Sequence, residues 1–169
     1  GHTGSGKSTI VNLICRFYEP TSGDILIDGH SYKDRSITWL HSNIGYVLQT
    51  PQLFSGSIME NVRYGKLDAT DEEVKNALKT VAADEFIERL DDKYESLVGE
   101  GGSKLSLGER QLISFARAIV ADPKILVLDE ATSSIDTKTE SMIQDAINKV
   151  MKGRTTFMIA HRLSTVVNA

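Results

Sequence analysis

The sequence predicts an α/β fold in which a mainly parallel sheet is flanked by helices and a helical subdomain is inserted into it. Two observations predict this fold. Short apolar runs with the character of buried strands alternate with segments of helical periodicity, and the middle of the chain is mostly helical in pattern. Such alternation is typical of parallel sheets with helices on both faces. We therefore expect the sheet core in residues 1–50 and 120–169, incomplete at both ends, and the helical subdomain in residues 51–119.

Each element follows from a local pattern. Apolar residues that recur every three or four positions predict helices at 7–17, 57–63, 71–82, 84–90, 106–121 and 137–151. Alternating or continuous apolar runs predict strands at 23–29, 44–49, 124–130 and 155–161. The apolar character of 124–130 is nearly continuous, which is typical of a buried parallel strand. The glycines of 98–104 predict a loop.

Composition limits the classes of function. The 169 residues suffice for one domain with a core, and 19 basic against 23 acidic side chains give a net charge of −4. We expect no nucleic-acid partner, because such binding usually needs a basic face. The single cysteine, Cys15, forms no internal disulfide, which fits a reducing cytoplasm. The chain begins on a glycine-rich loop of a kind that normally follows a strand, which indicates a fragment.

The first eight residues, "GHTGSGKS", match the phosphate-loop pattern G-x-x-x-x-G-K-[ST] at every fixed position. In this pattern the glycines let backbone N–H groups close around phosphate oxygens. Lys7 would reach the β- and γ-phosphates, and the Ser8 hydroxyl would reach Mg²⁺. The helix expected at 7–17 supports this interpretation over a simple glycine-rich turn.

Polar side chains end three of the predicted strands. Gln49 follows one strand, Asp129 and Glu130 end another, and His161 ends the last. The carboxyl ends of parallel strands line the ligand crevice, so we expect these side chains beside the phosphate loop. Asp129 suits a Mg²⁺ ligand, and Glu130 suits a general base that takes a proton from attacking water.

A second anion-binding feature occurs in "KLSLGERQ", at 104–111. Ser106, Gly108 and Glu109 stand where an apolar helix begins, and the start of a helix favours an anion through its unpaired N–H groups. One domain has no need for two phosphate cradles. The economical arrangement is two copies, each presenting this helix start to the nucleotide of the other.

Five motifs occur in the order found in ATP-binding cassette (ABC) proteins: "GHTGSGKST", the Gln of "YVLQTPQLF", "LSLGERQ", "ILVLDEATSSID" and "IAHRLST". The similarity covers essentially the whole chain, and "PQLFSGSIMENVRYG", "VGEGG" and "AHRLST" resemble the exporter branch. The resemblance implies a P-loop NTPase core with an inserted helical signature subdomain. It also implies an ATPase, a second ABC subunit as partner, and a transmembrane domain that is usually fused to the ATPase.

The resemblance also implies roles for single residues. The phosphates of ATP would be held by the loop Gly1, His2, Thr3, Gly4, Ser5, Gly6, Lys7, Ser8 and Thr9, in which His2 fills a free position. Mg²⁺ would be organised by Ser8, Gln49 and Asp129, while Glu130 would be the general base and His161 would contact the γ-phosphate. Ser106, Gly108 and Glu109 would meet the nucleotide of the opposite subunit. Asp136 would lie at the dimer seam, and Glu100 would face the transmembrane domain.

The signature departs from the usual LSGGQ, because Leu107 replaces a glycine and Glu109 replaces the glutamine. Glu109 puts an acceptor-only anion near a triphosphate, and we hypothesise that it weakens the site that it completes. Three functions stay open: the ATPase module of an exporter at the cytoplasmic face of the cell membrane, a soluble ABC ATPase in translation or DNA repair, and a regulatory half-site that mainly binds ATP. The exporter-like 51–65 segment favours the first.

Overall fold

The computed structural model describes residues 2, 4–129 and 136–160. Its centre is a three-stranded parallel sheet in the order β3-β4-β5, built from Ile44–Val47, Ile125–Asp129 and Thr155–Ile159. A separate two-stranded antiparallel sheet pairs β1 (Leu26–Ile27) with β2 (His30–Ser31). The fold is therefore mixed α/β with a parallel sheet, as the sequence predicts.

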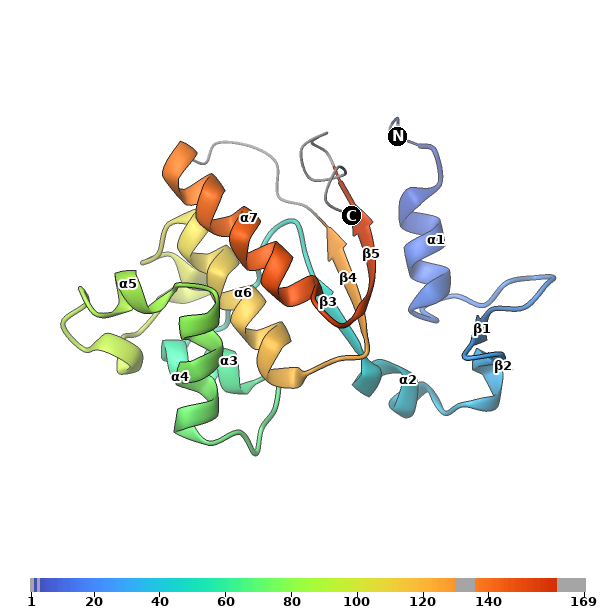
Figure 1. The fold of residues 1–169 in the computed structure, drawn as a ribbon, viewed down its shortest axis with the longest axis horizontal. Helices are drawn as coiled ribbons and strands as arrows, with labels where there is room; N and C mark the ends of the chain where they lie inside the picture. The colour runs from blue at the N-terminus through green and yellow to red at the C-terminus, as the bar shows by residue number, and fades with distance from the viewer. Residues whose placement is uncertain (1, 3, 130–135, 161–169) are drawn as a thin grey trace.

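Helices cover both faces of the three-stranded sheet. In Figure 1, α6 and α7 lie on one side of it and α1 on the other. The helices of the described chain are α1 (Lys7–Ile14), α2 (Ile37–Asn43), α3 (Ile58–Arg63), α4 (Asp71–Thr80), α5 (Asp84–Ile87), α6 (Leu107–Ala121) and α7 (Thr137–Met151). Short 3-10 turns occur at Tyr32–Asp34, Lys93–Glu95 and Glu100–Gly102.

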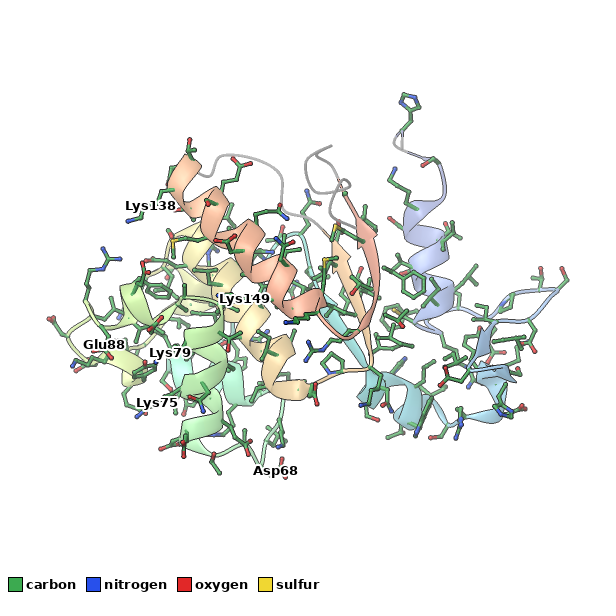
Figure 2. The ribbon with its side chains drawn as sticks, in the orientation of Figure 1. Asp68, Lys75, Lys79, Glu88, Lys138 and Lys149 are labelled. Carbon is green, nitrogen blue, oxygen red and sulfur yellow. The ribbon has the colours of Figure 1, made fainter. Side chains whose placement is uncertain are left out.

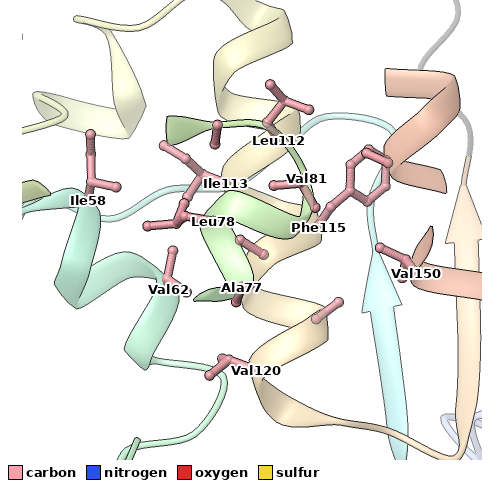
Figure 3. Packing of buried hydrophobic residues seen from close by; sticks show 14 of the residues in the cluster. Ile58, Val62, Ala77, Leu78, Val81, Leu112, Ile113, Phe115, Val120 and Val150 are labelled. Atoms are coloured by element: carbon pink, nitrogen blue, oxygen red, sulfur yellow. The ribbon is translucent and has the colours of Figure 1, made fainter. Parts of the chain in front are cut away.

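The main hydrophobic core joins α3, α4, α5, α6 and α7 to one face of the sheet. Figure 3 shows Ile58 and Val62 of α3, Leu78 of α4 and Ile113 of α6 meeting in its centre. Leu126 and Leu128 add the sheet to the same core. Burial of these side chains supplies the main driving force for folding, because each removes apolar surface from water.

The opposite face of the sheet carries a smaller core. Val127, which lies between the two leucines of β4, packs with Val11 and Cys15 of the α1 segment and with Ile159 of β5. Successive side chains of a strand point to opposite faces, so β4 uses its alternate residues for the two cores. Cys15 is buried, and burial raises the pKa of its thiol, as expected for a residue that fills the core. This small core fixes α1, and with it the phosphate loop, against the sheet.

Charged side chains occupy the outer surface of the helices. Figure 2 shows Lys75 and Lys79 on α4, and Lys138 and Lys149 on α7. The Lys75 ammonium lies 5.2 Å from the centre of the Tyr94 ring. Our division of the chain into a core and a 51–119 subdomain stays a prediction, although α3, α4 and α6 pack together on one side of the sheet (Figure 1).

The strand expected at 23–29 is wrong in extent. Only Leu26–Ile27 is a strand, and it turns back at once to pair with His30–Ser31. The turn residues Asp28 and Gly29 have φ angles of 51° and 80°. An Asp-Gly pair with two positive φ angles makes the tight turn that matches strand twist, so this stretch is a hairpin.

The first helix is shorter than expected. It ends at Ile14 rather than at 17, because Arg16 takes a left-handed conformation with φ 56°. The Arg16 side chain is fixed there by a salt bridge to Glu19 and a hydrogen bond to the carbonyl of Arg35. Phe17, whose apolar character extended the predicted helix, is exposed. The second helix, α2, was not predicted.

Candidate nucleotide site

The loop before α1 has the geometry of an anion cradle. Gly4 and Gly6 have φ angles of 80° and 86°, a left-handed conformation that glycine adopts without strain. Gly6 caps α1 without a side-chain hydrogen bond, and the first turn of the helix contains no acidic residue. An added Cβ at either glycine would meet no atom within 4 Å, so the space beside the loop is open. The helix start can therefore receive an anion.

The Lys7 side chain folds over this loop. Its ammonium donates hydrogen bonds to the carbonyl oxygen of His2, at 2.8 Å, and to the hydroxyl of Ser5, at 3.1 Å. A flexible, positively charged side chain at this place can turn from the loop to a bound phosphate.

Strand ends and loop meet in one pocket of about 330 Å³. Its walls are Gly4, Ser5, Gly6, Lys7, Ser8 and Thr9 from the loop and α1, together with Gln49, Asp129 and Ile159. Asp129 pairs with Ile159 at the carboxyl end of the sheet, and Gln49 follows the end of β3 by two residues. The strand-end argument thus predicted a juxtaposition that the structure contains, while the roles of these residues stay predictions.

The donor groups of this pocket fit Mg²⁺ with a polyphosphate. Ser8 offers a hydroxyl oxygen, Gln49 an amide oxygen and Asp129 a carboxylate. Mg²⁺ prefers such hard oxygen ligands, and it is usually held by one or two carboxylates together with substrate phosphates. Four other predicted site residues, Gly1, Thr3, Glu130 and His161, lie outside the described residues.

The signature residues lie elsewhere. Ser106, Gly108 and Glu109 belong to the start of α6, which Figure 1 places on the opposite side of the sheet from α1. None of them lines the pocket at the phosphate loop. The structure therefore does not bring the two predicted anion sites together within one copy of the chain.

Glu109 has a structural role that our sequence interpretation missed. Its carboxylate accepts the backbone N–H of Ser106 at 2.9 Å, while the Ser106 hydroxyl accepts the backbone N–H of Glu109 at 3.2 Å. This reciprocal pair is a capping box, which satisfies two N–H groups at the start of α6. The pattern Ser-x-x-Glu was visible in the sequence and would have predicted it. A glutamine could form the same bonds, so the distinctive property of Glu109 is its charge.

Gly108 is needed for close packing at the same helix start. It is buried, and an added Cβ would collide with the Thr139 methyl group in the first turn of α7. Asp136 caps α7 by accepting the N–H of Thr139, at 2.9 Å, and its hydroxyl, at 2.8 Å. These bonds stabilise the charged carboxylate and lower the pKa of Asp136. The starts of α6 and α7 therefore form one packed unit.

Comparison with known proteins agrees with the geometry of the phosphate loop. Residues 1–133 match the family model described as ABC transporter. All 169 residues align at 59% identity with an uncharacterised ABC transporter ATP-binding protein, YknV, of Bacillus subtilis. They align at 56% with YheH of the same species, a probable multidrug resistance ABC transporter ATP-binding/permease protein, and at 50% with ABC transporter B family member 21 of Arabidopsis thaliana.

The chain spans only part of each relative: 28% of YknV, 25% of YheH and 13% of the Arabidopsis protein. Within the described ranges, no helix is both long enough and apolar enough to cross a membrane. The family match covers well over half of the chain, and each of these relatives aligns with all 169 residues of it. The chain therefore belongs to the ABC transporter family and corresponds to the ATP-binding part of such proteins.

Proposed function

We propose that this chain binds ATP with Mg²⁺ and hydrolyses it, and that the energy drives export across a membrane. The observation that carries the proposal is the pocket that joins the phosphate loop to Gln49 and Asp129. Glycines at positive φ, a lysine and a helix start on one wall face oxygen ligands on the other. This combination suits a polyphosphate with a divalent cation.

In the proposed reaction the loop from Gly1 to Thr9 holds the phosphates, and Lys7 turns from His2 and Ser5 to the β- and γ-phosphates. Ser8, Gln49 and Asp129 hold Mg²⁺, which supplies neutralisation of phosphate charge when it is bound. Glu130 accepts a proton from the attacking water, and His161 contacts the γ-phosphate.

The site is completed by a second subunit in this proposal. Ser106 and Gly108 of that subunit bind the γ-phosphate, with Glu109 beside them, and Asp136 lies at the seam between the subunits. The separation of α6 from the phosphate loop within one copy supports this arrangement, because the two features cannot serve one nucleotide in a single chain.

We further propose a transmembrane partner and a place at the cytoplasmic face of the cell membrane. The support is that YheH, which the chain matches along its whole length, is named an ATP-binding/permease protein. Glu100 lies in a short 3-10 turn after Gly99, and we assign the loop around it to contact with the permease part.

The experiment is an ATPase assay on the intact protein with a matched pair of variants. Lys7→Ala removes the phosphate-binding cation, and Lys79→Ala removes a lysine from the outer face of α4 (Figure 2). We expect Lys7→Ala to lower turnover by about 100-fold or more, the scale of losing one transition-state donor, and Lys79→Ala to leave it unchanged. Equal rates in the two variants would contradict the proposal. Tight ATP binding without hydrolysis in the unaltered protein would favour the regulatory half-site instead.

A further inference from the structure

Arg117 on α6 binds the segment that immediately follows Gln49. Its Nε donates to the carbonyl oxygen of Asn61 at 2.8 Å, and its Nη1 donates to the carbonyl oxygen of Gln52 at 2.9 Å. Its Nη2 donates to the side-chain oxygen of Asn61 at 3.1 Å. All three partners come from residues more than fifty positions earlier in the chain, so these bonds join α6 to a distant segment.

Asn61 extends these contacts along the same segment. Its side chain is fully buried, and its amide donates to the carbonyl oxygens of Phe54 and Ser57, both at 3.0 Å. Its side-chain oxygen also accepts the backbone N–H of Phe54 at 3.1 Å. Arg117 and Asn61 together therefore fix the backbone of residues 52–57, and every polar group of the Asn61 side chain is used.

The Arg117 guanidinium is surrounded by hydrogen-bond acceptors and aromatic rings. The Arg117 side chain is partly buried, and this burial lowers the pKa of its guanidinium. Within the described ranges no carboxylate forms a salt bridge with it, and its neighbours are two backbone carbonyl oxygens, the side-chain oxygen of Asn61 and two aromatic rings. The Phe54 and Tyr64 ring centres each lie 5.9 Å from the guanidinium carbon. A planar guanidinium suits such a fork of acceptors between rings, whereas an ammonium does not.

The anchored segment begins close in sequence to the pocket at the phosphate loop, because Gln52 follows Gln49 by three residues. Gln49 lines that pocket, and three residues span at most about 10 Å, so an anchor at Gln52 restricts where Gln49 can lie. Gly65 adds a second close approach, because a Cβ there would collide with the carbonyl oxygen of Arg117. The segment from 52 to 65 is thus held on α6, the helix that Ser106 caps.

We propose that Arg117 is a positioning residue for Gln49. By holding the Gln52 carbonyl and Asn61 on α6, it keeps the Gln49 side chain in reach of the cation at the phosphate loop. This inference rests on the proposed function, since it takes Gln49 as a ligand of the nucleotide-bound cation. Residues that orient metal ligands in this way typically change metal affinity by about 10- to 100-fold when they are replaced.

The test measures cation binding rather than turnover. The intact protein is saturated with a non-hydrolysable ATP analogue, Mn²⁺ is added in place of Mg²⁺, and free Mn²⁺ is counted by electron paramagnetic resonance. Arg117→Lys keeps the positive charge but loses the planar fork of donors. We expect it to weaken Mn²⁺ binding about tenfold while the affinity for the analogue in EDTA stays the same.

Arg154→Lys is the matched control. Arg154 also donates to backbone carbonyls, of Pro123 at 3.1 Å and of Val150 at 2.8 Å. It directly precedes β5, and it bonds to Pro123 and, through a salt bridge, to Asp122, both of which precede β4. These contacts lie at the end of the sheet opposite to Asp129. Arg154→Lys should lower the melting temperature and leave Mn²⁺ affinity unchanged. If Arg117→Lys behaves as Arg154→Lys does, Arg117 is only structural and the inference is overturned.

A second variant covers the case in which Arg117→Lys does not fold. Phe54→Leu removes one ring from the guanidinium face and keeps the three hydrogen bonds, and Phe54 is 40% exposed, so the fold tolerates it. A smaller loss of Mn²⁺ affinity supports the inference, and an unchanged affinity overturns it. An unaltered protein that binds no analogue would refute the proposed function itself, which is a different result.

Discussion

At the scale of single residues, Gly108 is required for close packing and is also a proposed ligand of the phosphate. The helix start that we assign to a phosphate also has to approach α7 so closely that a methyl group does not fit. Packing against α7 therefore requires a glycine at this position whether or not a nucleotide binds there. Loss of activity on replacing Gly108 would not by itself demonstrate contact with phosphate.

Gly108→Ala should destabilise the protein by about 1–3 kcal/mol, the usual cost of an extra methyl group in a packed site. The clash is with the Thr139 methyl group, and Thr139→Ser removes that methyl while keeping the hydroxyl that binds Asp136. The double variant should therefore regain most of the lost stability. Thermal melts of the four proteins measure this, and a double variant no more stable than Gly108→Ala would show that the collision is not the cause.

Glu109→Gln should raise ATP turnover in the assembled protein. Glutamine retains the bond to the Ser106 N–H and so preserves the capping box, while the negative charge that we propose lies near the triphosphate of the opposite subunit is lost. Ser106→Ala is the contrasting variant, because it breaks the cap and should cost about 1 kcal/mol of stability. Steady-state hydrolysis at saturating ATP is the measurement, and an unchanged rate would refute our hypothesis that Glu109 weakens the site.

At the scale of elements, the capping carboxylate at the start of α7 predicts that the stability of the fold depends on pH. The hydrogen bonds from Thr139 lower the pKa of Asp136 below its ordinary value of 3.8. A carboxyl group whose pKa is lower in the folded state than in the unfolded state stabilises the fold at pH values above its pKa in the unfolded state. That stabilisation is lost as the pH falls through the pKa in the folded state.

Asp136→Asn should remove this dependence and keep the cap, because asparagine is an equally good capping residue. We expect the difference in stability between the two proteins to be constant above about pH 5 and to shrink below about pH 4. Denaturant unfolding at a series of pH values measures the difference. A difference that stays constant into the acid range would contradict the assignment.

The sequence predicted the elements that have a clear period and missed those set by turns. The helix at 106–121 and the strand at 124–130 agree with α6 and β4 to within a residue, because long periodic or continuous apolar runs leave little choice. The hairpin at Asp28 and Gly29 was missed although an Asp-Gly pair is a strong local signal. The end of α1 was missed because it depends on contacts of Arg16 that are distant in sequence.

The candidate site was predictable for the same kind of reason. The phosphate loop and the strand-end residues Gln49 and Asp129 follow from a fixed spacing and from the geometry of parallel sheets. Arg117 and Asn61 were not predictable, because their partners are mostly backbone carbonyls, which any residue could supply. Such contacts leave no pattern of residue types in a single sequence.

At the scale of the whole molecule, the two candidate anion sites lie on different sides of the sheet. The phosphate loop belongs to α1 and the signature to α6, with the strands between them (Figure 1). Within one copy, the start of α6 could reach a nucleotide at the phosphate loop only if the two cores that hold α6 and α1 against the sheet were disrupted. We propose that a second copy supplies the missing half, which needs no such change.

The most direct test is the mass of the ATP-binding domain with its natural flanking sequence, measured by light scattering with and without ATP and Mg²⁺. Glu130→Gln should stop hydrolysis, because Glu130 is the proposed general base, and should thereby preserve the ATP-bound dimer. Ser106→Arg in the same background blocks the signature helix start. We predict a dimer that forms only with ATP and Mg²⁺ and that Ser106→Arg abolishes without loss of ATP binding. A protein that binds ATP tightly and stays a monomer would contradict the claim that one copy completes the site of another.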